Sequence, residues 1–420
     1  MPPPVSIARP ANLLPPSGKL YFGFDSPAMT LGVYIQVPFC QTKCTYCNFH
    51  TGVVSRRRYQ PYVAAVCEEI EKSTANAAVD TVYFGGGTPS LLEAEALAKI
   101  VGRVRKAFRV ASNAEISLEA DPETITADKS SSWRSAGFNR ISLGVQSFND
   151  VELQWAGRMH RQSDIYRATR ILRDAGFSNI SVDLIAGLPH QTRDSWDASV
   201  STLIGDAQSG MPAPLEPEHI SIYMLEIDEG SRLGREAIAG GARYGSRAIP
   251  PDDAIAEFYE SACARLAGAG YEHYEISNWA LPGFRSRHNL KYWRREPYLG
   301  FGAGAHSFDG ATRWANVHDS ARYVACIEQG TSPREQIETV TPEQALEEEF
   351  FLGLRQLEGI DLGRIEALYG DNGLRYRVAS LRDRIRDLAR QGLVELDGTR
   401  VRLQPSRLTV SNEVFVALLD

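Results

Sequence analysis

The sequence predicts an α/β fold in which helices cover a mainly parallel sheet. Six short apolar runs rich in β-branched residues recur between residues 32 and 227, and amphipathic helical stretches separate them. Some of these helical stretches end in glycine, as helix C-termini often do. This alternation is typical of βα units, which form either an open doubly wound sheet or a curved partial barrel. In both architectures ligands bind at the C-terminal ends of the strands.

The six predicted strands can be read directly from the sequence. They are GVYIQVPF at 32–39, DTVYFGGG at 80–87, EISLEAD at 115–121, RISLGVQSF at 140–148, NISVDLIAGLP at 179–189 and HISIYMLEI at 219–227. We expect a mobile proline-rich tail at 1–30, a barrel at 31–250 and an aromatic-rich extension at 251–339. Helical patterns and a hairpin turning at Asp397 and Gly398 then predict a small winged-helix-like domain at 340–420.

Composition and charge narrow the function classes. The 420 residues carry a net charge of −7 and a pI near 5.7, so no global basic field attracts nucleic acid or an anionic membrane. The sequence shows neither a signal peptide nor an apolar run of the roughly 20 residues that a membrane-spanning helix needs. With six cysteines in this length, we expect a cytoplasmic protein. In that compartment clustered cysteines bind metal more often than they form disulfides.

Three of the cysteines lie together in the loop after the first predicted strand. Cys40, Cys44 and Cys47 have the spacing C-x3-C-x2-C. Structural zinc would need a fourth ligand, which His50 would provide. A [4Fe–4S] cluster normally takes four cysteines, so three would leave one iron open to another ligand. The spacing favours the cluster over zinc.

This triplet, with Tyr46 directly before its last cysteine, resembles the signature of the radical S-adenosylmethionine (SAM) superfamily. The resemblance implies a partial (βα)6 barrel and a [4Fe–4S] cluster whose open iron chelates SAM. The cofactor would then supply the radical chemistry, and the protein would position it.

Polar residues near the other strand ends indicate the rest of a binding site. The glycines of FGGGTPS at 84–90 allow backbone N–H groups to approach a polar ligand closely, although a plain tight turn would look the same. Glu119, Gln146 and Asp183 lie within or at the ends of apolar runs and need partners, either a ligand or a core hydrogen bond. Arg158 would pair with a carboxylate or lie on the surface.

The motifs YIQVPFC, GGGTPS, LEADP, LGVQSF, GRMHR and DLIAGLP, in this order, resemble the family of oxygen-independent coproporphyrinogen III oxidase and its paralogues, the HemW-like heme chaperones. The resemblance implies that Tyr34, Gly86 and Glu119 contact the cluster-bound SAM. The positions that match the surroundings of a second SAM in the oxidase are Tyr46, Gly87, Thr88, Gln146, Arg158 and Asp183. The oxidase has Phe where this chain has Tyr46, which leaves a second SAM open.

Two features separate the two branches of this family. The oxidase carries a fourth cysteine where this chain has Phe49, and HemW-like members carry an aromatic residue there. RHNLKYW at 287–293 resembles the HemW motif H-N-x-x-Y-W, which is implicated in heme handling. Imidazole is an apt axial ligand for heme iron, so His288 is a candidate, with His273, His306 and the cysteines as others. The alternative is a histidine with satisfied hydrogen bonds in an aromatic loop.

The sequence therefore predicts a heme chaperone that holds a [4Fe–4S] cluster and SAM and passes heme to acceptor proteins such as respiratory enzymes. Coproporphyrinogen III oxidase is the alternative enzyme, and a structural zinc protein is a third hypothesis. We expect no nucleic-acid partner, since acidic residues outnumber basic ones from 341 onward. A homodimer is possible, and membrane contact would come through acceptor proteins alone.

Overall fold

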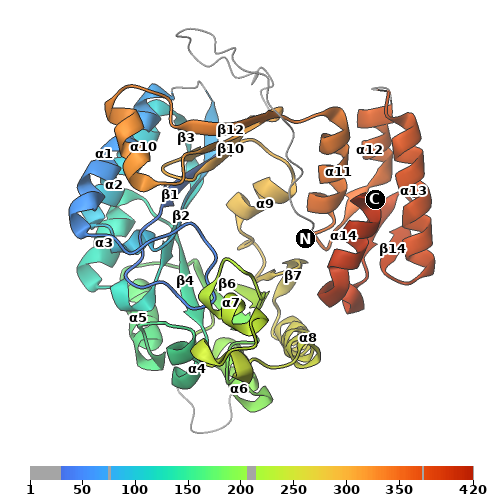
Figure 1. Ribbon diagram of the computed structural model, residues 1–420, viewed down its shortest axis with the longest axis horizontal. Coiled ribbons are helices and arrows are strands. Elements are labelled where there is room, and N and C mark those ends of the chain that lie inside the picture. Colours follow the sequence, from blue (N-terminus) through green and yellow to red (C-terminus); the bar gives the residue numbers. More distant parts are fainter. Residues whose placement is uncertain (1–29, 74–76, 206–213, 371–372, 420) are drawn as a thin grey trace.

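The computed structural model describes residues 30–73, 77–205, 214–370 and 373–419, so the predicted proline-rich tail lies outside the described residues except for Thr30. Six parallel strands form the centre of the molecule (Figure 1). They are β1 (Leu31–Val37), β2 (Ala78–Gly86), β3 (Arg109–Ala120), β4 (Arg140–Gln146), β5 (Ile180–Ala186) and β6 (His219–Met224). Each pairs with the next in chain order, without the reversal of strand order that marks a doubly wound sheet. This confirms the partial barrel.

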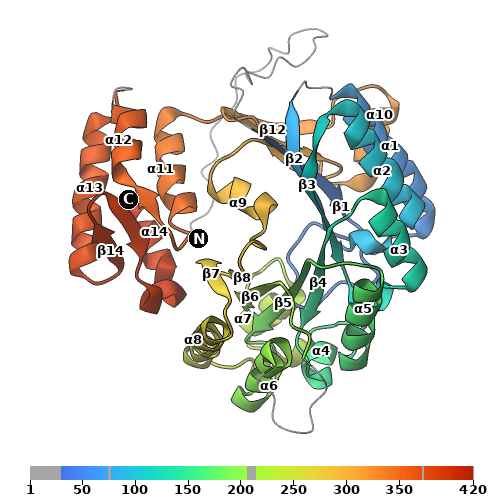
Figure 2. The same cartoon turned by 180° about the vertical axis from the view of Figure 1, so that it is seen from behind.

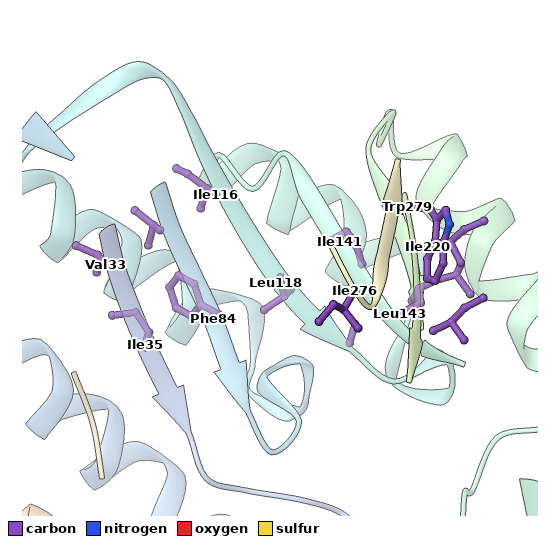
Figure 3. Close-up of a cluster of buried hydrophobic side chains, with 14 of the residues drawn as sticks. Val33, Ile35, Phe84, Ile116, Leu118, Ile141, Leu143, Ile220, Ile276 and Trp279 are labelled. Carbon is purple, nitrogen blue, oxygen red and sulfur yellow. The ribbon is translucent and has the colours of Figure 1, made fainter. Parts of the chain in front are cut away.

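Helices cover the outer face of the strands, where the main apolar core lies. They are α1 (Tyr59–Lys72), α2 (Ala94–Ala107), α3 (Ala127–Ala136), α4 (Asp150–Trp155), α5 (Gln162–Asp174), α6 (Arg193–Ile204) and α8 (Asp252–Gly268). The short α7 (Arg232–Ile238) lies instead against the loop after β1, where Leu233 N donates to Thr45 O at 2.8 Å. Figure 3 shows strand residues such as Ile35, Phe84 and Leu118 in this core. Each such side chain contributes roughly 2 kcal/mol when fully buried.

The inner face of the same strands is polar. Side chains alternate along a strand, so the neighbours of the apolar residues point into the barrel. Thr81, Ser117, Ser142 and Asp183 occupy such inner positions, and the first three are buried. The barrel interior is therefore a polar shaft, and binding groups can line it without disturbing the outer core.

The sheet extends further at both edges than the sequence predicted, to twelve strands among the described residues. The added elements are β7 (Glu272–Glu275), β8 (Asn278–Ala280), α9 (Arg287–Trp293), β9 (Tyr298–Phe301), β10 (His306–Phe308), β11 (Thr312–Asn316), α10 (Ser320–Glu328) and β12 (Arg334–Thr339). β9 pairs with β1 and β8 with β6, so β1 and β6 do not pair with each other. These strands are three to six residues long, too short to show a period in sequence.

The C-terminal part forms a separate group of helices beside the barrel (Figure 2). Its elements are α11 (Pro342–Gly353), β13 (Ile360–Asp361), α12 (Leu362–Tyr369), α13 (Arg375–Arg390), β14 (Val394–Asp397), β15 (Arg400–Leu403) and α14 (Ser411–Leu419). β14 and β15 form the predicted hairpin, with Gly398 at φ +58°, and β13 completes a small antiparallel sheet. Within the described residues, no helix has the length and apolar character needed to cross a bilayer.

Candidate functional site

A cavity of about 450 Å³ opens at the C-terminal ends of the parallel strands, as expected for this architecture. The structure brings most of the predicted site residues together in its walls. Those lining it are Cys40, Tyr46, Cys44, Cys47, Gly86, Gly87, Thr88, Glu119, Gln146, Arg158 and Asp183. Tyr34 and His288 are not among the lining residues, and each has a different role in the structure.

The three cysteines lie on the loop between β1 and α1, which we call the cysteine loop (residues 38–52). Its ends are joined because Cys40 N donates to Gly52 O at 3.0 Å and Gly52 N donates to Pro38 O at 2.9 Å. All three thiols are free and half-buried. Burial raises the pKa of Cys40 and of Cys47. The loop therefore holds three thiols at the rim of one cavity.

The surroundings of these thiols fit a cluster. Thr51 also lines the cavity, and its buried hydroxyl has no hydrogen-bond partner within the described structure. Across the chain segments described above, no three His, Cys, Asp or Glu side chains converge enough to hold one metal ion. A [4Fe–4S] cluster does not require three side chains to converge on one ion, because each thiolate binds a different iron.

The glycine-rich turn after β2 passes close against the cysteine loop. A Cβ on Gly87 would lie 2.5 Å from Phe39 O and 3.0 Å from Cys40 Sγ. Gly86 has φ +115°, and a Cβ there would lie 2.5 Å from the Gln36 amide nitrogen. Both positions therefore require glycine. This explains the glycine run by contact with the thiol loop rather than by turn geometry alone.

Glu119 closes the cavity at the end of β3. Its carboxylate accepts hydrogen bonds from Tyr83 OH at 2.8 Å and from Gly86 N at 3.1 Å. Burial raises the pKa of this carboxyl to about 7. Tyr34 stacks on Tyr83 with 6.1 Å between ring centroids and donates its hydroxyl to Gln36 at 2.7 Å. Tyr34 thus supports this wall from within the barrel.

Arg158 joins the strand ends to the cysteine loop. Its guanidinium forms an ion pair with Asp121, donates to Gly144 O at 2.7 Å and lies 3.4 Å from Cys44 Sγ. Thr88 donates its hydroxyl to Asp121 at 2.9 Å. Our sequence interpretation missed Asp121, although it lies two residues beyond Glu119 and the period of a strand places both on one face.

Gln146 and Asp183 line the lower wall. Gln146 has φ +70°, a strained conformation for this residue type, at a register shift between β4 and β5. Burial raises the pKa of Asp183 to about 6, and Ser142 Oγ lies 3.4 Å from its carboxylate. Tyr223, also on the cavity wall, was not predicted because its strand reads as apolar.

His288 lies in α9, away from this cavity. Its ring nitrogens are hydrogen-bonded to Thr81 Oγ1 at 2.9 Å and to Tyr292 OH at 2.8 Å, and its side chain is buried. Burial lowers its pKa to about 3. In this conformation both nitrogens are hydrogen-bonded, so His288 could bind heme iron only by giving up one of these bonds, and its role as a heme ligand stays a prediction. The alternative, a histidine with satisfied hydrogen bonds, describes what the structure contains.

Comparison with known proteins identifies the family. Residues 34–203 match the Radical SAM superfamily model and residues 340–406 match the HemN C-terminal domain. Heme chaperone HemW of Bacillus subtilis is 35% identical over 392 residues, which cover 92% of this chain and 98% of that protein. Heme chaperone HemW of Mycobacterium tuberculosis is 35% identical over 402 residues, covering 94% and 96%.

The solved structure of coproporphyrinogen III oxidase (HemN) from Escherichia coli has the same fold, with a TM-score of 0.77 and 22% identity over 93% of this chain and 90% of that one. The superfamily implies a [4Fe–4S] cluster and SAM. Full-length similarity at 35% identity, a barrel with three thiols at its mouth and a HemN-type C-terminal domain agree. This chain belongs to the HemW family of the radical SAM superfamily.

Proposed function

We propose that this protein is a heme chaperone, which binds heme and delivers it to acceptor proteins such as respiratory enzymes. The observation that carries the proposal is the similarity to curated proteins named heme chaperone HemW over nearly their whole length. Phe49 supports it, because it lies where the oxidase pattern has a fourth cysteine.

We propose that Cys40, Cys44 and Cys47 hold the [4Fe–4S] cluster. Support comes from three free thiols on one loop whose ends are tied together, and from Gly87, which lets the neighbouring turn pass against Cys40. The unpartnered Thr51 hydroxyl is a donor suited to a cluster sulfide or thiolate.

SAM would bind across the strand ends, with Tyr34, Gly86 and Glu119 on one side. Bound SAM would supply radical chemistry at the barrel mouth. Glu119 offers a carboxylate that Tyr83 and Gly86 hold in place, and Arg158 offers a cation near Cys44. A second SAM is a further part of this proposal. Six residues that line the cavity would surround it: Tyr46, Gly87, Thr88, Gln146, Arg158 and Asp183.

The assignment of domains also belongs to this proposal, with the barrel at 31–250, the extension at 251–339 and the C-terminal domain from 340. β12 ends at Thr339 and α11 begins at Pro342, which supports the last boundary.

One experiment tests the function. The protein is purified without oxygen and its cluster reconstituted, and then three quantities are measured: heme bound per chain, transfer of heme to an apo-acceptor, and turnover of coproporphyrinogen III. We expect stoichiometric heme binding and transfer without turnover. Conversion to protoporphyrinogen would overturn the chaperone in favour of the oxidase. Zinc without iron or sulfide would exclude both.

A matched pair of variants tests the ligand set. Cys44→Ala removes a thiol at the cavity and should abolish the cluster absorption while the barrel stays folded. Cys326→Ser changes a half-buried thiol on α10 and should keep full iron content. Iron and acid-labile sulfide per chain, with far-ultraviolet circular dichroism, give the readout. A normal cluster in Cys44→Ala would contradict the assignment.

A further inference from the structure

On the cysteine loop, His50 lies close to two histidines from a much later part of the sequence, His306 and His318. His50 and His318 have ring centroids 4.3 Å apart. His306 lies on the hairpin beside them, because Gly304, two residues before it, would place a Cβ 3.0 Å from His318 Nδ1. Our sequence interpretation gave His50 only as a zinc ligand and His306 as one of several heme ligands, and it did not single out His318. We call the three residues the histidine rim.

The histidine rim is built on a fixed support. His306 begins β10 and His318 follows β11, and the segments are joined by Asn316 N donating to Ala305 O at 2.9 Å and Gly304 N donating to Val317 O at 3.0 Å. The buried Glu69 of α1 accepts hydrogen bonds from Gly302 N, Asn316 Nδ2 and Tyr323 OH. The hairpin that carries two of the imidazoles is thus anchored to the barrel.

Two of the three imidazoles of the rim are exposed and open to a ligand. His50 and His306 are exposed, and His318 is half-buried. His318 Nδ1 is buried without a hydrogen-bond partner in the described residues. His288, by contrast, has both ring nitrogens occupied. The rim therefore presents two exposed imidazoles next in sequence to, or packed near, the cavity-lining Phe49, and α9 presents none.

The surface next to the rim is apolar with a cation beside it. Phe49 and Val53, on either side of His50 in sequence, are 67% and 60% exposed, which is unusual for such large apolar side chains. Lys43 Nζ donates to the backbone carbonyl oxygen of Phe49 at 3.4 Å, so a positive charge lies beside this part of the loop. An exposed aromatic ring, nitrogen donors and a cation match the flat face, the iron and the propionates of heme.

We propose that the histidine rim supplies the axial ligand of the iron in bound heme, with Phe49 against the porphyrin. A porphyrin already provides four nitrogen donors, so its iron needs only one or two from the protein. A bare metal ion would need more donors converging on one point, and within the described residues no such group of three exists. This inference rests on the proposed function and names the site of its cargo.

Hemin titration of the cluster-loaded, full-length protein without oxygen tests the site. Magnetic circular dichroism and resonance Raman report whether iron carries an imidazole, independently of delivery. In the triple variant His50→Gln, His306→Gln, His318→Gln we expect loss of the imidazole signature and an affinity for hemin lower by about tenfold or more. Added imidazole should restore the spectrum. The triple variant could misfold. The single variant His306→Gln, at an exposed position, should keep the fold, so the same spectra and hemin affinity are measured for it as well.

His190→Asn is the matched control, because His190 is exposed, has φ +67° and lies on the loop after β5. Asparagine tolerates that backbone conformation, so the hemin spectrum should match the wild type. An unchanged signature and affinity in the triple variant would overturn the histidine rim while leaving the chaperone function standing. Wild-type protein that takes up no hemin would overturn both. Loss of bare Zn²⁺ binding with heme ligation retained would assign the rim to a metal ion instead.

Discussion

At the scale of single residues, the site depends on side chains that are absent as much as on those present. Gly86 and Gly87 allow the turn after β2 to approach the cysteine loop and Gln36 more closely than any side chain would permit. Residue type and spacing predicted the glycines, the thiols and Glu119. They did not predict Asp121, because its pairing with Arg158 depends on how β3 and the loop after α4 approach each other.

Gly87→Ala provides a test at this scale. Its Cβ would collide with Phe39 O, a backbone atom that cannot move aside cheaply, so we expect the turn to shift away from Cys40. Iron content should fall, and the free energy of unfolding should drop by about 1–3 kcal/mol. Iron analysis and urea denaturation measure both.

Gly102→Ala is the control for that substitution. Gly102 lies on the exposed face of α2 with open space around its Cβ position, so alanine should stabilise the helix by up to about 1 kcal/mol and leave iron content unchanged. Equal iron content in the two variants would contradict the proposed contact between turn and thiol loop.

At the scale of elements, α9 closes the N-terminal end of the barrel. Ser286 caps it by accepting from Asn289 N, Glu115 accepts from the His288 backbone, and Lys291 is buried in ion pairs with Asp80 at 2.9 Å and Glu296 at 2.8 Å. The segment RHNLKYW therefore forms a helix that polar contacts fix at the N-terminal end of the barrel. Sequence could not reveal this, since its partners lie on β2 and β3, more than 170 residues away.

His288 should make stability depend on pH. Its pKa of about 3 when folded is far below the ordinary value of 6.5, so the unfolded chain binds the proton first. Stability from this residue is complete above pH 6.5 and is lost as pH falls toward 3. At pH 5 the loss is on the order of 2 kcal/mol.

His288→Asn checks this dependence. We expect the variant to unfold more easily at pH 7.5, because Thr81 and Tyr292 lose their shared partner. Its deficit relative to the wild type should shrink at pH 5. The urea midpoints of the two proteins at the two pH values measure this difference in stability. A difference that is the same at both pH values would contradict the proposed role of His288.

At the scale of the whole molecule, charged residues join the C-terminal domain to the barrel extension. Glu348 of α11 pairs with Arg295, at 2.7 Å, and with Arg313 of β11. The alternation of strands and helices predicted the barrel, and the turn at Asp397 and Gly398 predicted the hairpin of the last domain. It could not predict this junction, or the strands at the sheet edges, because short segments and exposed charges carry no period.

Glu348→Gln should weaken this junction. Arg295 is only 10% exposed and would keep only its longer ion pair with Glu349, at 3.5 Å, so loss of the Glu348 charge should cost about 1–3 kcal/mol. Limited proteolysis should then cut near residue 340 sooner than in the wild type. Glu366→Gln breaks an exposed pair with Arg382 and should cost less than about 1 kcal/mol. Identical digestion of both variants would contradict the proposal that the ion pairs of Glu348 hold the C-terminal domain against the barrel extension.

The position of α9 at the N-terminal end of the barrel also bears on the order in which ligands would bind. His288 and Lys291 are buried at the other end of the strands, so a small molecule held against Glu119 would enter and leave through the cavity at the C-terminal strand ends, which Phe49 also lines. A ligand that bound last at this opening would therefore have to leave first. On the proposed function, SAM would have to bind before a porphyrin covered this opening, and the porphyrin would have to leave before SAM could be exchanged.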